Sequence, residues 1–129
     1  MRHSFDYAVI RVVPRVEREE FINAGVVVFA LQLQFLRARI NADAGRLRAL
    51  WPDIDVDAVA AHLHAFPLIC EGSPEAGPIA QLTRRERFHW LVAPRSTIIQ
   101  ISPVHTGLCE TPELALQQLF EKLVSVSQH

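Results

Sequence analysis

Cationic side chains, hydroxyl groups and a histidine gather in one segment of the sequence, residues 84–109. Its polar members are Arg84, Arg85, Arg87, Arg95, Ser96, His105 and Thr106. Guanidinium groups bind carboxylates and phosphates through pairs of N–H donors, and imidazole and hydroxyl groups add further polar contacts. These residue types predict a binding site for an anionic group, either a phosphate-bearing ligand or the carboxylates of a protein partner. The competing interpretation is that the arginines hold backbone carbonyls and brace loops, and both remain open at this stage.

A second group of residues, nearer the N-terminus, has side chains suited to acid–base chemistry. Glu20 and Asn23 end a charged connection directly before a predicted strand. If that connection is helical, both face the end of the sheet beside Arg11. Glu20 is then the acid or base of a small phosphoester- or nucleotide-processing enzyme, His105 is its complement, and Arg11 and Arg95 hold the anion. The simpler interpretation is a solvated connection with local ion pairs.

Other familiar catalytic and cofactor patterns are missing from the sequence. The two cysteines and six histidines form no C-x-x-C, H-E-x-x-H or H-x-x-x-H spacing. His62 and His64 are two positions apart, so on a helix they point in different directions and cannot share an ion. No G-x-S-x-G surrounds a serine, and no glycine spacing matches a P-loop or a dinucleotide-binding loop. We therefore expect no metal and no cofactor.

Length and composition predict a single domain over residues 1–129. Half of the chain is hydrophobic (50%) and 21% is charged, which suits one buried core. The formal net charge of -1 argues against general nucleic-acid binding, which depends on many cationic contacts to phosphates. The two cysteines are in no motif, the N-terminus lacks the apolar run of a signal peptide, and no apolar stretch approaches the ~20 residues of a membrane helix. We expect a cytoplasmic protein.

The predicted strands cluster rather than alternate with helices. This order indicates an α+β fold with a mostly antiparallel sheet of about five strands and helices packed against it. Strands are predicted at residues 5–13, 26–31, 36–40, 88–92 and 97–101 from their β-branched and aromatic content. The alternation of apolar residues changes phase between Phe35 and Leu36, which predicts a turn or bulge at residues 32–35.

The strand predicted at 88–92 determines how the candidate anion site would form. On a strand, Arg87 and His89 share one face, opposite Phe88 and Trp90. The turn that contains Arg95 and the loop that contains His105 then converge with them at one end of the sheet.

Three helices are predicted between and after these strands. The first covers residues 43–51, and the second begins after Asp53 or Asp55 and ends at Pro67. Residues 72–78 are predicted to be a loop and residues 102–110 an irregular segment. The last helix begins at Thr111-Pro112-Glu113, a typical helix start.

Two segments of the chain resemble a bacterial family, domain of unknown function 3037. The first is YAVIRVVP at residues 7–14 with EFINAGVVVF at 20–29, and the second is FHWLVAPRSTIIQ at 88–100 with PVHTG at 103–107. Residues 32–34 depart from the family, whose members tend to have a polar, glycine-bearing turn there. No activity defines the family. The resemblance implies that genes of the family frequently lie beside genes of HipA-like kinases. It therefore implies a protein partner rather than a substrate.

These observations favour a non-catalytic binding or regulatory module that acts through a protein partner, such as a HipA-like kinase. In this hypothesis Arg87, Arg95 and His105 contact an acidic partner surface. The alternative is the small phosphoester- or nucleotide-processing enzyme described above. A third hypothesis is a homo-oligomer that associates through an exposed sheet edge or the last helix.

Overall fold

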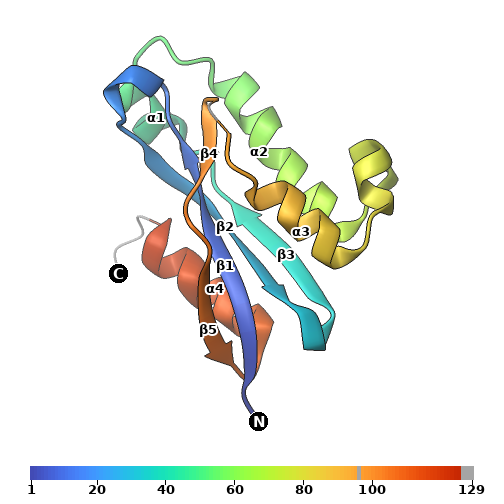
Figure 1. The fold of residues 1–129 in the computed structure, drawn as a ribbon. Helices are drawn as coiled ribbons and strands as arrows, with labels where there is room; N and C mark the ends of the chain where they lie inside the picture. The colour runs from blue at the N-terminus through green and yellow to red at the C-terminus, as the bar shows by residue number, and fades with distance from the viewer. Residues whose placement is uncertain (96, 126–129) are drawn as a thin grey trace.

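The computed structural model of the chain describes residues 1–95 and 97–125. Within these ranges a five-stranded antiparallel sheet has helices on both faces, so the predicted α+β class is confirmed (Figure 1). The strands are β1 (His3–Val12), β2 (Ile22–Ala30), β3 (Phe35–Ile40), β4 (Ile99–Ile101) and β5 (His105–Cys109). The α-helices are α1 (Ala44–Leu50), α2 (Val56–Glu71), α3 (Arg84–Val92) and α4 (Pro112–Leu123). Three 3-10 segments complete the chain: η1 (Val16–Arg18), η2 (Leu31–Leu33) and η3 (Pro74–Gln81).

The central strand β1 carries two partners on one of its edges. Strands β3, β2 and β1 follow in that order, and the far edge of β1 pairs with β4 over residues 10–12 and with β5 over residues 3–7. Ser102 lies at the break between β4 and β5. Its N–H donates to the Val9 carbonyl at 2.9 Å, and its Oγ accepts from the Val9 N–H at 2.8 Å. A side chain therefore continues the hydrogen bonding of the sheet between the two short strands.

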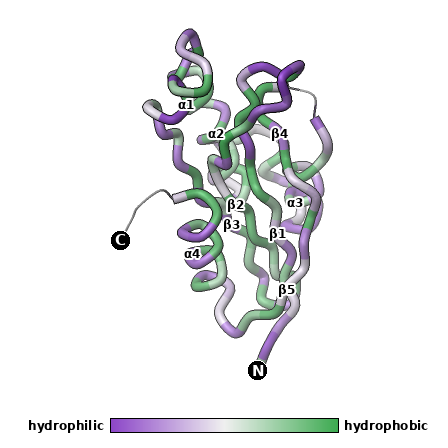
Figure 2. Tube along the Cα trace, turned by 90° about the vertical axis from the view of Figure 1, so that its left-hand side faces the viewer, coloured by the Kyte–Doolittle hydropathy of each residue, from purple (hydrophilic) through white to green (hydrophobic). Residues whose placement is uncertain are grey.

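The two faces of the sheet are covered by different helices. Ala8, Ile10 and Val12 of β1 face α2 and α3, whereas Phe5 and Tyr7 face α4. Figure 2 shows hydrophobic strands in the middle, with α4 on one side and α3 on the other. Helix α4 buries Ala115, Leu116 and Phe120. We call these the α2–α3 face and the α4 face.

The predicted turn at residues 32–35 is present. The chain leaves β2 through η2 and enters β3 after Gln34, whose φ of 52° is left-handed. Glycine usually occupies such a position because other residues meet steric strain there. The turn corrects the change of phase, so Leu36 packs into the core of the α2–α3 face.

The strand predicted at residues 88–92 is wrong, because these residues end helix α3. Thr83 and Glu86 form a capping box: the Thr83 Oγ1 accepts from the Glu86 N–H at 3.2 Å, and a Glu86 carboxylate oxygen accepts from the Thr83 N–H at 3.0 Å. Phe88 and Leu91, three positions apart, are the residues of α3 that the fold buries. Both signals belong to a helix.

Three other expectations need correction. Helix α2 begins after Asp55 as predicted but runs through Pro67 to Glu71, since Ile69 and Cys70 beyond the proline are buried in the core. Residues 74–81 form 3-10 turns rather than an open loop, with a break at Gly77 (φ 79°). The segment predicted to be irregular contains β5. In the described ranges no helix is long and apolar enough to cross a membrane.

Candidate functional site

Arg87 connects two helices instead of pointing from a strand. Its Nη1 donates to the Leu82 carbonyl at 2.6 Å, and its Nη2 donates to the Cys70 carbonyl at 3.3 Å. Arg87 and His89 share no face, since they are two positions apart on α3. The predicted pairing of these two side chains is therefore wrong, and the contacts of Arg87 are those of a brace between α2 and the start of α3.

Arg95 follows α3 and holds the end of that helix. Its Nη1 donates to the Leu91 carbonyl at 2.8 Å and its Nη2 to the Trp90 carbonyl at 3.0 Å. The guanidinium carbon also lies 5.1 Å from the centroid of the Trp90 ring and 5.6 Å from that of Phe66. Burial lowers the pKa of the Arg95 guanidinium. These contacts hold the guanidinium in one place.

A pocket of about 430 Å³ lies beside Arg95, between α2, the end of α3 and β4. Its lining is mainly apolar and contains no carboxylate: His62, Ala65, Phe66, Ile69, Trp90, Leu91, Arg95, Thr97, Ile98 and Ile99. Ser96, also predicted to bind, lies outside the described residues. Arg95 is thus the member of the predicted binding set that lines this pocket.

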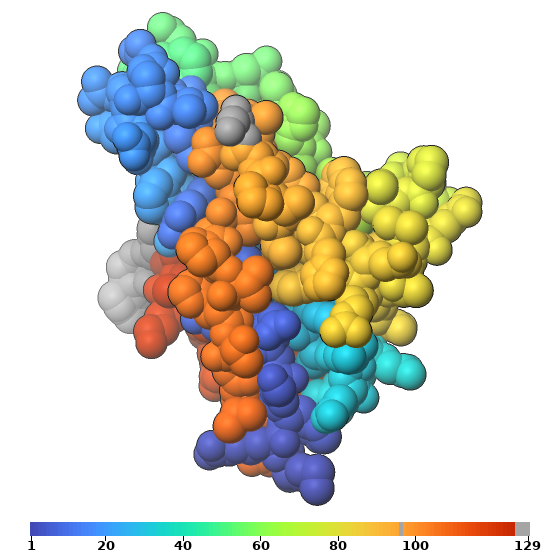
Figure 3. All heavy atoms as spheres, in the orientation of Figure 1, coloured from blue at the N-terminus to red at the C-terminus, as the bar shows by residue number. Residues whose placement is uncertain are grey.

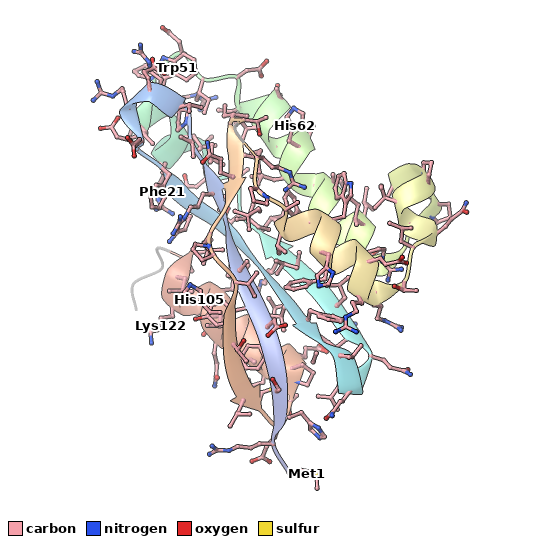
Figure 4. All side chains as sticks on the ribbon, in the orientation of Figure 1. Met1, Phe21, Trp51, His62, His105 and Lys122 are labelled. Carbon is pink, nitrogen blue, oxygen red and sulfur yellow. The ribbon has the colours of Figure 1, made fainter. Side chains whose placement is uncertain are left out.

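His105 and Thr106 begin strand β5, and they point to opposite faces of the sheet. His105 pairs with Tyr7, and the two ring centroids are 5.3 Å apart on the α4 face. Thr106 pairs with Asp6, and its Oγ1 donates to the Asp6 carboxylate at 2.9 Å. Both are exposed. In Figure 4 His105 lies on the β5 side of the sheet, away from His62 of α2.

The outer edge of β5 is free. In the described part of the chain β5 pairs with β1 alone, so its second edge presents backbone groups to solvent. Figure 3 shows β5 along the surface, in orange, with nothing in front of it. Leu108 is 62% exposed, and Val104 just before the strand is 44% exposed. No residue of β5 is an Asp, Glu, Lys or Arg, whereas the opposite edge strand β3 contains Arg37 and Arg39.

A groove lies beside this free edge, on the α4 side. It encloses about 680 Å³ between β5 and α4. Phe5, Cys109 and Leu119 contribute apolar surface, and the charged lining residues are Arg2, Glu110 and Lys122. The free edge and the groove form a continuous surface, because Leu108 and Cys109 of β5 belong to both.

Arg11 and Asn23 lie directly across from each other on β1 and β2. The Asn23 Nδ2 donates to the Leu123 carbonyl at 3.1 Å and so holds the end of α4. The Arg11 guanidinium lies 4.3 Å from the centroid of the Phe21 ring, at the end of the sheet where Figure 4 labels Phe21. Arg11 Nε and Asn23 Oδ1 are buried and have no hydrogen-bond partner among the described residues. Asn23 therefore positions α4 against the sheet.

Glu20 lies in the exposed connection before β2. Arg18 Nε donates to Glu20 at 2.7 Å, and this hydrogen bond lowers the pKa of Glu20. The connection is not a helix beyond the three residues of η1. In the described part of the chain no hydrogen bond or ion pair joins Glu20 to Arg11 or His105. Its contacts are those of the solvated connection with local ion pairs.

The homo-oligomer hypothesis named an exposed sheet edge without assigning it to β5, and neither the pocket nor the groove was predicted. Among the described residues no group of three or more His, Cys, Asp and Glu side chains could hold a metal ion. The weak signal for β5 was the alternation of Val104, Thr106 and Leu108 with smaller or polar residues. No pattern in the sequence pointed to the pocket, because its walls come from elements that are distant in the chain.

Comparison with known proteins gives one match. The family model described as "Protein of unknown function (DUF3037)" matches residues 7–124. No curated protein and no solved structure matches the chain.

Proposed function

This chain belongs to the DUF3037 family of unknown function, and we propose from its geometry that it is a non-catalytic module that binds an extended segment of a protein partner along the free edge of β5. The single observation that carries this proposal is the uncharged, uncovered edge of β5 beside a groove. The proposed setting is the bacterial cytoplasm.

The free edge supplies the backbone part of such binding. A strand that adds to an exposed sheet edge gains main-chain hydrogen bonds, and pockets beside the edge select its side chains. Proteins usually protect their edges with charged residues, and β3 has Arg37 and Arg39 for this purpose. Strand β5 has no such residue, and it exposes Leu108.

The groove supplies the side-chain part. Alternate side chains of an added strand would lie over the groove between β5 and α4, where Phe5, Leu114 and Leu119 offer apolar contacts. Leu114 is half-exposed although it is a large apolar residue. We therefore propose a partner segment with apolar side chains at every second position.

The predicted anion-binding residues divide between two roles in this proposal. His105 and Thr106 lie on β5 and contact the partner. Arg87 and Arg95 already donate to backbone carbonyls, so we assign them to the support of α3 rather than to an acidic partner surface. The resemblance noted above makes a HipA-like kinase the first partner to test.

The test places a charge on the edge without changing the core. Leu108→Lys puts an ammonium group beside the added strand, and the matched control Val16→Lys changes a residue that is 45% exposed, in η1. Titration calorimetry with the purified kinase should show affinity reduced about tenfold or more by Leu108→Lys and unchanged by Val16→Lys. Equal affinity of both variants would refute binding at the edge. If light scattering instead shows a concentration-dependent dimer of the chain that Leu108→Lys abolishes, the edge joins two copies and the heterologous partner is wrong.

A further inference from the structure

We infer that the pocket between α2, α3 and β4 is a binding site for an aromatic carboxylate, with the carboxylate on Arg95 and the ring against Trp90. The residues that carry this inference differ from those of the β5 edge. The site therefore does not depend on the proposed partner binding.

The pocket has the size and lining of a small-molecule site. Ligand pockets commonly measure roughly 300–1,000 Å³ and are mainly apolar, with a few polar groups that fix orientation. This pocket is about 430 Å³, and its apolar lining residues include Ile69, Leu91 and Ile98. The pocket lies against the buried core of the α2–α3 face, because Phe66 and Ile99 belong both to that core and to the pocket wall.

Arg95 is prepared to receive an anion. Two of the five N–H groups of a guanidinium are used for the Trp90 and Leu91 carbonyls, and the other three have no partner in the described ranges. The two hydrogen bonds and the two rings hold the group in place, so little side-chain entropy is lost when an anion binds. No carboxylate of the described residues forms an ion pair with Arg95. A half-buried cation without a counterion attracts an anion more strongly than a solvated one, since less water screens it.

The charged residues of the pocket lining favour a negatively charged ligand. Arg95 and His62 are the ionisable residues of the pocket, and neither Asp nor Glu lines it. His62 is on α2, on the exposed side of the helix in Figure 4. An anionic ligand meets only cationic or neutral groups there.

Trp90 favours an aromatic body. Its side chain is 44% exposed, although tryptophan is the largest side chain and gains most from burial. Phe66 supplies a second ring in the lining, with its centroid 5.6 Å from the Arg95 guanidinium carbon. A planar ring placed against Trp90 would bury its exposed surface and bring a carboxylate substituent to Arg95.

The experiment uses 2-naphthoate and its uncharged amide, 2-naphthamide, as probes of the full-length chain. Two-dimensional ¹H–¹⁵N NMR follows the indole N–H signal of Trp90, and the indole of Trp51, which does not line the pocket, is the internal control. We expect naphthoate to shift the Trp90 signal in a saturable manner, to leave Trp51 unchanged, and to bind about tenfold or more tightly than naphthamide. Arg95→Gln should remove this preference for the acid.

A second variant keeps the test decisive if Arg95→Gln weakens the end of α3. Ala65→Phe fills the pocket from α2 and leaves Arg95 in place, so it should abolish binding of both probes. A Trp90 signal that naphthoate leaves unmoved at millimolar concentration would overturn the inference. Equal binding of acid and amide, or binding that survives Ala65→Phe, would overturn it as well.

Discussion

Replacement of Ser102 by alanine tests how the sheet is held between β4 and β5. The Ser102 Oγ accepts from the Val9 N–H at 2.8 Å and donates to the Pro103 carbonyl at 2.9 Å, and the residue is 4% exposed. Ser102→Ala leaves the Val9 N–H buried without a partner. An unsatisfied buried donor costs about 1–3 kcal/mol, so we expect the free energy of unfolding to fall by about 2 kcal/mol.

The expected loss is large enough to measure in two ways. An unfolding entropy of about 2.1 cal/mol/K per residue converts 2 kcal/mol into a Tm lower by about 7 °C for a chain of this length. Urea denaturation should show a lower midpoint with an unchanged m-value. The control Ser73→Ala removes a hydroxyl that accepts from the Glu75 N–H in an exposed cap, and should cost about 1 kcal/mol or less.

Hydrogen exchange separates this cause from general loosening. The Val9 amide and the amides of β5 should exchange faster in Ser102→Ala than in Ser73→Ala, because the hydroxyl joins β5 to β1 through this point. A free energy of unfolding that Ser102→Ala changes by less than about 0.5 kcal/mol would refute the reasoning, since a buried orphaned donor cannot be so inexpensive.

Three further predictions follow from other parts of the fold. Burial raises the pKa of the Cys70 thiol to about 12 from 9.0. Above pH 9 the thiol loses its proton in the unfolded chain but keeps it in the folded chain, so the free energy of unfolding should decline as pH rises. Denaturation curves of Cys70→Ala at several pH values should show a smaller decline. Gly25→Ala should destabilise the sheet by roughly 1–3 kcal/mol, because the added Cβ would lie 2.8 Å from the Arg39 carbonyl oxygen. The control Gly45→Ala meets only ordinary contacts and should be neutral or stabilising. An unchanged urea midpoint for Gly25→Ala would contradict the close approach. Thr83→Ala removes the cap of α3 and should cost about 1 kcal/mol, and an unchanged denaturation midpoint would argue against the capping box.

Local patterns were sufficient for the first half of the sheet. β1 and β2 are rich in β-branched residues, which is a strong strand signal, and the phase change before Leu36 corresponds to the turn at η2. The helix start at Thr111-Pro112 was also read correctly, although the Thr111 side chain makes no capping hydrogen bond.

Residues 84–92 show where the same reasoning fails. Phe88, Trp90 and Val92 have strand propensity, and their alternation concealed the helix-start signal at Thr83 and Glu86. Strand β5 was not predicted, for another reason. It is short, contains Gly107, and exists because β1, about a hundred residues away, offers it an edge.

The candidate site is harder to predict from the sequence than the fold, because it depends more on such long-range contacts. The contacts of Arg87 and Arg95 agree with the competing interpretation, in which the arginines hold backbone carbonyls, but no spacing rule gives which carbonyls they reach. The pocket forms where α2, the end of α3 and β4 meet, and the groove forms where β5 and α4 meet residues 2 and 5 near the N-terminus.

The most direct test of the proposed function is hydrogen exchange of the β5 amides in the complex recovered with the tagged chain. The free chain should exchange the outward-facing amides of residues 105–109 quickly, because no strand in the described ranges lies beyond β5. In the complex we expect strong protection at these amides, and a Leu108→Lys chain should recover little of the partner. A stoichiometric complex in which β5 exchanges as fast as in the free chain would contradict the central claim.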